Sequence, residues 1–571
     1  MDVKRPIVDL EERVSFVHST ADKDVQGEYA DVKTPGDLEG GALVAGGALS
    51  LMSREAMGLL SQYAAIGVVL NMLPSLSYPL FTAYLNMEGY QTSSYGVLVT
   101  IGYSYKVFFG MLSDCFPIFG YRRKPWMLIG WTTTMICLSI LTFSSFGTPF
   151  CDREKTKYCG KALETVPASE LKHFNLSAPD QGMFYIMVSM VASIAYIIAA
   201  CASDAMVVEY AQREPEAIRG RVQTAIYVVR TISGIASSVT IGFGLNGPNY
   251  GGAFGFAISP NVPYGICLIP CVLAVIATLT LVVDKKTPGV PFREWCANFW
   301  ELLQHRVMWQ ICLFRVVVSG LQSIGATPGS LISLYWAKVE PINNAVMDLA
   351  SSAIFIATLS AVGKWGLAWN WRVMIAFGTL GVMIIDGPVL FLTIWDVVRN
   401  QWFYTGATLA DTIPAGVRFI VSTYCAVEVA DVGNEGATYG LITTIANLMG
   451  PIGSVVYKYI DSYFKVFAND IKRDSDEVRW DVSYVYFISY GCKIMSLFGL
   501  LLLPPQKKEM QELKRKGGKS KVAGALIIIG YFVCISFSMT SSIMAIYPST
   551  KCYRIAGGNG KVDANGKCLK R

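Results

Sequence analysis

Seven ionisable side chains interrupt long apolar blocks of this sequence, and they are the residues best suited to bind a charged solute or a proton. They are Lys106, Asp204, Arg230, Arg315, Asp386, Asp411 and Arg418. Such groups are costly in hydrocarbon, so in membrane helices they pair with one another or face a water-filled cavity. The set therefore predicts either internal salt bridges or a binding site for substrate or protons. Its four cations and three acids leave one spare positive charge, which suits an anionic solute.

Helical spacing adds to this prediction. Asp411 and Arg418 are seven residues apart and so share one helix face. Lys106, Arg230 and Arg315 each lie about 12 Å from the nearest end of their blocks by helical rise, too deep for easy snorkelling to the interface. We expect these side chains to find polar partners inside the protein.

A second charged group lies in the stretch GMLSDCFPIFGYRRKPW, between two apolar blocks. Asp114 ends one block, and Arg122 and Arg123 precede the next. An acid and arginines at helix ends form charge-assisted hydrogen bonds that can alternate between two packed states, as in a gate. The alternative is that the cations only fix the topology and bind lipid phosphates.

The composition predicts a polytopic membrane protein. Of the 571 residues, 53% are hydrophobic and 16% are charged, whereas an average soluble domain has about 25% charged residues. Apolar blocks of spanning length occur near 58–84, 92–113, 126–147, 182–209, 222–245, 261–283, 307–336, 343–366, 372–394, 400–427, 437–460, 481–504 and 522–547. The net charge of +6 is small, and no basic surface suited to nucleic acid is present.

These blocks predict an all-α fold of two six-helix bundles with a thirteenth helix. The expected parts are a polar cytoplasmic tail (1–56), the first bundle (57–283), a cytoplasmic connector (284–306), the second bundle (307–504), a basic cytoplasmic segment (505–521), the extra helix (522–547) and a tail (548–571). Two related halves are typical of secondary transporters. The segments AMVVEYA (205–211) and CAVEVA (425–430) are a weak internal sequence repeat, which places Glu209 and Glu428 at corresponding helix ends of the two halves.

Loop charges predict the orientation. Compact Lys/Arg clusters fall on one side of the predicted helices, so we expect a cytoplasmic N-terminus. The loop at 148–181 then lies outside, together with Cys151, Cys159 and the sequon at Asn175. We predict Cys151–Cys159 as a candidate disulfide and Asn175 as a candidate glycosylation site. Cys552 and Cys568, in the last tail, form a second candidate pair.

The segment S-D-x-x-P-I-x-G-x-R-R-x-P, which starts at Ser113, resembles the loop signature of the folate–biopterin transporter family within the major facilitator superfamily. Lys106, the run SDAMVVE that ends at Glu209 and the run RGRVQ that starts at Arg219 also match that family. The loop is longer in its middle than the general superfamily pattern. The resemblance is most specific in the first half of the chain.

The resemblance implies a major-facilitator-like fold and a folate, a pterin or a related heterocycle as substrate. It also widens the predicted cytoplasmic gate, which comprises Gly110, Asp114, Gly120, Arg122, Arg123, Glu209, Arg219 and Glu428. A glutamyl carboxylate on the substrate would seek Arg or Lys. One of the buried aspartates would accept the proton of a symport cycle.

We therefore expect a secondary active transporter, with the lipid bilayer, a small-molecule substrate and protons as its partners. We expect no enzyme, no cofactor and no metal site, because the sequence has no Walker loop, HExxH or GxSxG motif. The alternatives are a transporter of another organic solute, such as S-adenosylmethionine, and a non-transporting receptor or scaffold on the same fold. The expected location is the plasma membrane, with an organelle membrane as the alternative.

Overall fold

The computed structural model describes residues 47–211, 213–215, 221–365, 369–429, 435–564 and 567–568. In parts of α6, α11, α13 and α14 it describes the helix but not every side chain. All structural statements below refer to these residues.

The first half consists of helices, two of which, α4 and α5, are joined by a long loop at residues 144–177. The helices of this half are α1 (Arg54–Ser75) with the π-helix η5 (Ser77–Tyr84), α2 (Gly89–Thr100), the 3-10 helix η6 (Ile101–Tyr105), α3 (Lys106–Cys115), α4 (Lys124–Phe143), α5 (Ala178–Ala211), α6 (Arg221–Val239) with η11 (Thr240–Gly244), and α7 (Val262–Thr280). A connecting helix, α8 (Phe292–Gln304), follows.

The second half has the same character. Its helices are α9 (Arg306–Gln322), α10 (Gly329–Tyr335), α11 (Pro341–Trp365), α12 (Trp371–Ile394), α13 (Gln401–Val429), α14 (Glu435–Asp461), α15 (Ala468–Arg473), and α16 (Asp476–Ser496) with η13 (Leu497–Leu502). The chain closes with α17 (Lys507–Lys516), α18 (Lys521–Ile546) and the short η14 (Arg554–Ala556).

The all-α membrane fold is confirmed, but the count of thirteen spans is not. Eleven helices of the described chain are long and apolar enough to cross a membrane. The seventh predicted block is divided into α9 and α10, because the backbone between them leaves the helix before Pro328. α13 covers the tenth block but is not among the eleven.

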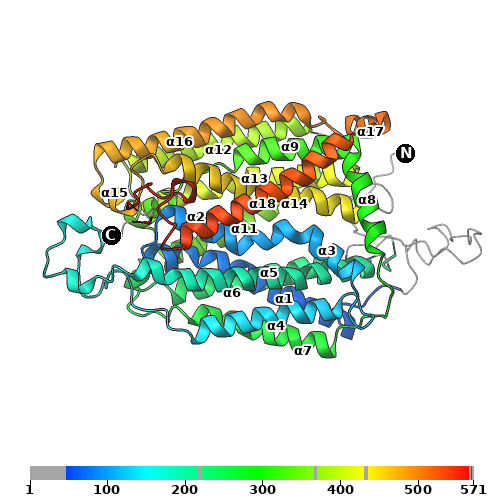
Figure 1. Ribbon diagram of the computed structural model, residues 1–571, viewed down its shortest axis with the longest axis horizontal. Coiled ribbons are helices and arrows are strands. Elements are labelled where there is room, and N and C mark those ends of the chain that lie inside the picture. Colours follow the sequence, from blue (N-terminus) through cyan, green and yellow to red (C-terminus); the bar gives the residue numbers. More distant parts are fainter. Residues whose placement is uncertain are drawn as a thin grey trace, which may run out of the picture.

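The two halves form neighbouring bundles. α1, α4, α6 and α7 lie in the lower part of Figure 1, and α9, α12 and α16 lie in the upper part. Small residues allow close packing within a bundle, as membrane helices require. At Gly130, for example, an added Cβ would lie 2.7 Å from the carbonyl oxygen of Ala195 and 2.8 Å from the Cβ of Ala199, so α4 meets α5 closely.

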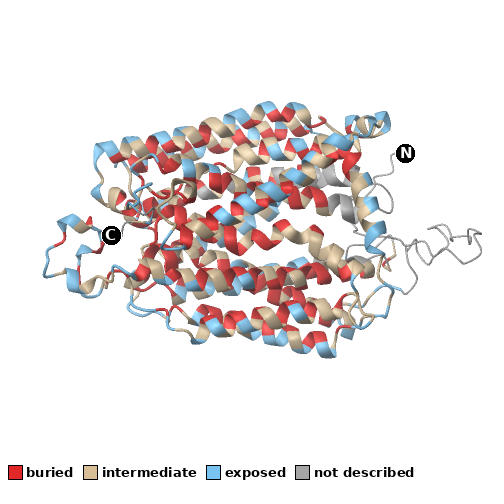
Figure 2. Cartoon of the chain, in the orientation of Figure 1, coloured by how far each residue is buried: buried red, intermediate tan, exposed pale blue. Residues whose placement is uncertain are grey.

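The pattern of burial fits a lipid surround. Buried residues lie mainly between the helices (Figure 2). The outer surface of the helices exposes large apolar side chains, among them Ile269, Phe377, Ile384 and Leu526. Exposed apolar surface on this scale is expected against hydrocarbon and not against water.

The bundle has two distinct ends. The structure joins Cys151 to Cys159 and Cys552 to Cys568, with Cα–Cα distances of 5.5 and 5.4 Å, and we call the end that carries them the disulfide end. The opposite end carries Arg123, α8 and α17, and we call it the Arg123 end (Figure 1). By the loop charges this is the end expected in the cytoplasm.

The last long helix, α18, runs obliquely across both bundles (Figure 1). It packs against α2 and α5 of the first half and against α9 and α14 of the second. The Tyr531 hydroxyl donates a hydrogen bond to the Ser104 carbonyl at 2.7 Å, and beyond the helix Arg554 Nη1 donates to the Ser462 carbonyl at 2.6 Å. α18 and the segment after it are therefore attached to both halves.

Candidate functional site

A lysine–aspartate pair lies in the middle of the first bundle. The Nζ of Lys106 lies 2.9 Å from Asp204 Oδ2, and the Tyr63 hydroxyl donates a hydrogen bond to Asp204 Oδ1 at 2.5 Å. The three residues come from α3, α5 and α1. The change from the 3-10 turns of η6 to α3 occurs at Lys106 itself, which sets the direction in which its side chain leaves the backbone.

The Lys106–Asp204 pair, called the central pair below, is partly exposed and also contacts other polar and aromatic side chains. The side chains of Lys106 and Asp204 remain 30% and 42% exposed, respectively, although both lie within membrane spans. The Lys106 ammonium also lies 5.7 Å from the centre of the Tyr103 ring. A charged pair with open surface within membrane spans is expected to face a pathway, because facing lipid would be costly.

The other predicted binding residues lie on different helices. Arg230, on α6, places its guanidinium 4.8 Å from the Tyr227 ring centre. In the second half, Asp386 on α12 accepts a hydrogen bond from the Tyr490 hydroxyl at 2.5 Å, and the Arg315 guanidinium on α9 lies 5.9 Å from the Phe314 ring centre. Each half therefore contains an aspartate that accepts a tyrosine hydroxyl.

Asp411 and Arg418 both lie on α13, but their side chains are outside the described part. Of the predicted set, the structure therefore brings Lys106 and Asp204 together and places Arg230, Arg315 and Asp386 on three further helices.

A compact ion-pair network occupies the Arg123 end. Arg123 is 7% exposed, and its guanidinium contacts Asp114 Oδ1 at 2.7 Å, Glu209 Oε1 at 3.3 Å and Ser113 Oγ at 2.7 Å. One carboxylate oxygen of Asp284 accepts the backbone N–H of Arg123 at 2.9 Å and that of Lys124 at 3.0 Å. We call Ser113, Asp114, Arg123, Glu209 and Asp284 the Arg123 network.

The Arg123 network ties four helix ends of the first half together: the ends of α3 and α5, the start of α4 and the turn after α7. Burial acts to lower the pKa of the Arg123 guanidinium. The carboxylates of Asp114 and Glu209 outweigh this effect, so its pKa lies above the ordinary value. Arg123 therefore stays charged. The pairing of a buried arginine with two acids is geometrically specific.

The structure treats the other predicted gate residues differently. Arg122 is half-buried, and no hydrogen bond or ion pair of its side chain is found in the described chain, although it adjoins Arg123. Gly120 has a φ of +84°, a turn conformation that favours glycine, whereas a Cβ at Gly110 would meet no atom. Arg219 and the side chain of Glu428 lie outside the described residues.

Sequence reasoning did not identify Ser113 and Asp284 as members of the network. Asp284 directly follows the sixth apolar block, at the same end as the cluster, and this position was the available signal.

The two halves also meet at the disulfide end. A Cβ at Gly89 would lie 2.0 Å from the Thr327 carbonyl oxygen, so α2 begins directly against the turn before α10. The Thr92 and Ser330 hydroxyls are 3.3 Å apart. Lys472 on α15 lies between two aromatic rings, 5.1 Å from the centre of Phe150 and 4.8 Å from that of Tyr335. The described contacts therefore close the disulfide end.

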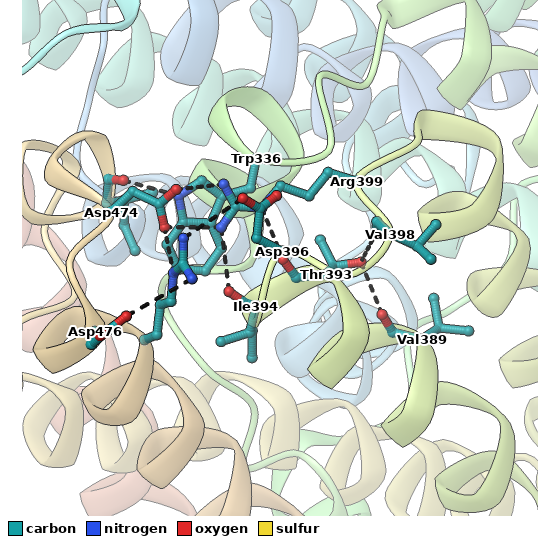
Figure 3. Close-up of polar contacts among 11 residues, drawn as sticks. Trp336, Val389, Thr393, Ile394, Asp396, Val398, Arg399, Asp474 and Asp476 are labelled. Carbon is teal, nitrogen blue, oxygen red and sulfur yellow. Dashed lines mark hydrogen bonds and ion pairs between the residues drawn. The ribbon is translucent and has the colours of Figure 1, made fainter.

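An arginine–aspartate cluster fixes the turns behind this contact (Figure 3). Asp474 accepts hydrogen bonds from Arg399 Nη2 and from Arg479 Nε, both at 2.9 Å, and Asp396 pairs with Arg399 Nε at 3.1 Å. The Arg399 guanidinium also lies 4.8 Å from the Trp336 ring centre. The cluster links the end of α10 to the α12–α13 and α15–α16 turns.

We expect this cluster to make the protein sensitive to acid. Burial acts to raise the pKa of Asp474, but Arg399 and Arg479 outweigh it, so the pKa is lowered overall. A depressed pKa contributes stability that is complete above the unfolded value of about 4 and is lost as the pH falls through the folded value. Thermal unfolding of the purified protein, followed by tryptophan fluorescence, should show a melting temperature that declines below about pH 4. Asp474→Asn should reduce that decline, and an unchanged decline would contradict the assignment.

The comparisons with known proteins agree with this geometry. Residues 67–146 match the model of the BT1 family, which confirms the resemblance to the folate–biopterin transporters. No curated protein matches the chain in sequence.

Two solved structures show the fold. A D-xylose–proton symporter is 13% identical with a TM-score of 0.50, and the match covers 80% of this chain and 99% of that one. A mutant of the peptide transporter POT is 10% identical with a TM-score of 0.51, and the match covers 82% and 97%. The chain is a multi-pass membrane protein with the fold of major facilitator transporters, and these findings support a secondary transporter.

Proposed function

We propose that this secondary transporter moves a folate, a pterin or a related heterocyclic metabolite across the membrane by alternating access, coupled to protons. The observation that carries the proposal is the central Lys106–Asp204 pair with its open surface within membrane spans. The match to the folate–biopterin transporters over residues 67–146 supports the choice of substrate class.

The central pair offers a simple route to coupling. While Asp204 is ionised, its carboxylate forms an ion pair with the Lys106 ammonium at 2.9 Å. Protonation of Asp204 removes that partner and leaves Lys106 free for a substrate carboxylate, which is the charge that a glutamyl group would bring. Proton binding and anion binding then favour each other, as symport requires. Arg230, Arg315, Asp386, Asp411 and Arg418 remain proposed contributors to the same pathway.

The Arg123 network is proposed as part of the gate at its end, with Gly110, Gly120, Arg219 and Glu428 as the further proposed members. Arg122 is proposed to adjoin this gate without making a pairing that transport requires. Its charge-assisted contacts hold the helix ends of the first half as one unit, which suits a bundle that moves as a rigid body. The first and second bundles, at 57–283 and 307–504, are proposed as the moving bodies.

The deciding experiment is an uptake panel in proteoliposomes. Radiolabelled folate, biopterin and S-adenosylmethionine are added outside the vesicles, with and without a proton gradient in which the outside is more acidic than the inside. We expect folate or biopterin to accumulate, and to accumulate more with the gradient. Accumulation of S-adenosylmethionine alone would show that the substrate is not a folate or pterin. Binding of a compound without its accumulation would favour a receptor.

A further inference from the structure

Lys458 is the most deeply buried cation of the described chain. It lies on α14, one turn from the disulfide end, and its exposed fraction is 0%. Its Nζ lies 2.8 Å from Ser94 Oγ on α2. Because α2 belongs to the first half and α14 to the second, this hydrogen bond crosses the contact that closes the disulfide end.

The surroundings of Lys458 do not suit a charged ammonium. Within the described residues no carboxylate pairs with it. Ser94 donates its own hydroxyl proton to the Tyr90 carbonyl at 2.8 Å, so it meets Lys458 as an acceptor. An ammonium has three N–H donors, and burying it with one acceptor is much more costly than burying a neutral amine.

Charged or titratable groups of α2, of α14 and of the segment after α18 have partners of their own. They include Glu88, Tyr90, Asp461 and Arg554. Glu88 accepts the N–H of Ala468, and Asp461 accepts the N–H of Thr327, both at 2.7 Å. Arg554 donates to the Ser462 carbonyl and lies 4.1 Å from the Tyr463 ring centre. No described contact joins any of these acids to Lys458.

We propose that Lys458 is a proton-binding site linked to the disulfide end, neutral while the two halves are in contact there and protonated when they separate. As α2 and α14 move apart, water reaches the amine, whose nitrogen takes one proton from the solvent. The same proton returns to the solvent when the halves close. This inference rests on the proposed function, because it assumes that the halves separate at that end during transport.

The proposal sets the direction of a pH effect. Opening binds one proton, so acid favours the open disulfide end and alkali favours the closed one. The ratio of closed to open protein should rise about tenfold per pH unit over the range in which Lys458 titrates. Replacement of Lys458 by an apolar residue should remove that dependence and favour the closed state.

A cysteine pair can report the closed state. Thr92 and Ser330 meet across the interface with hydroxyls 3.3 Å apart, so Thr92→Cys/Ser330→Cys should form a cross-link when the halves touch. The purified full chain is oxidised briefly at several values between about pH 6 and about pH 9. The same pair is made with Lys458→Met, Lys458→Gln and Lys465→Met. The two Lys458 variants give the pH dependence of cysteine oxidation alone.

Lys465→Met is the matched control, since Lys465 lies at the same end but is 52% exposed and pairs with Glu477. We expect cross-linking with native Lys458 and with Lys465→Met to rise with pH more steeply than with Lys458→Met or Lys458→Gln. Equal pH profiles in all four proteins, or a steeper rise in the Lys458 variants, would overturn the proposal. The readout uses no substrate, so failure of the uptake panel alone would remove the substrate assignment and leave the proton site intact.

Discussion

Arg123→Gln is expected to reduce the initial rate of uptake at least about tenfold while the protein still reaches the membrane. The substitution keeps a polar side chain but shortens it, removes its charge and leaves Asp114 and Glu209 without their cation. The two carboxylates, whose side chains are 21% and 38% exposed, then repel each other across the site that the guanidinium filled. The four helix ends tied by the network should then move independently. Uptake into proteoliposomes at matched protein content measures the effect.

The adjacent arginine provides the control. Arg122→Gln makes the same change one residue away, at a side chain for which no hydrogen bond or ion pair is found in the described chain. We expect its uptake to stay within about twofold of the unmodified protein, as for most surface substitutions. If the two variants transport equally, the Arg123 network has no role in transport and only stabilises the turn.

Asp204→Asn is expected to abolish accumulation driven by protons while leaving exchange of substrate across the membrane measurable. Asparagine keeps the shape of the side chain but cannot be protonated, and it leaves Lys106 permanently available to an anion. Lys106→Met should instead weaken substrate binding, seen as a rise in KM of at least about tenfold. Counterflow and gradient-driven uptake, measured on the same proteoliposomes, separate the two effects.

A second lysine–aspartate pair serves as the comparison for this experiment. Lys155 contacts Asp152 at 2.7 Å in the loop at the disulfide end, where the Lys155 side chain is 66% exposed. The double variant Lys155→Met/Asp152→Asn should transport normally, because an ion pair exposed to water contributes little to stability. Gradient-driven accumulation by Asp204→Asn at the unmodified rate would exclude Asp204 as the coupling group.

Long-range hydrophobic patterning was enough to predict the helices, because lipid leaves the backbone few alternatives. It did not divide the seventh block into α9 and α10, although Gly325, Pro328 and Gly329 in that stretch are residues that interrupt helices. Spacing also could not distinguish Arg122 from Arg123, because the turn decides which of them enters the protein. The Lys106–Asp204 contact joins residues 98 positions apart in the chain, and only tertiary packing brings them together.

Lys458 shows a different limit of sequence reasoning. Its position near the end of an apolar block is one at which a lysine normally extends to the membrane interface. In the structure the neighbouring half covers that end, so the same residue is fully buried. The sequence of one helix does not reveal which other helix will cover it.

The attachment of α18 to both halves has a consequence for how the protein is made. α18 is synthesised after α2, α5, α9 and α14, so the surfaces of these helices that contact it stay uncovered until translation of the chain is almost complete. The two bundles can insert and fold one after the other. The interface between them is completed only when residues 521–546, which form α18, leave the ribosome. Maturation of this protein should therefore end with a docking step that shorter chains of the same architecture do not need, and truncation before Lys521 should leave those surfaces open to the lipid.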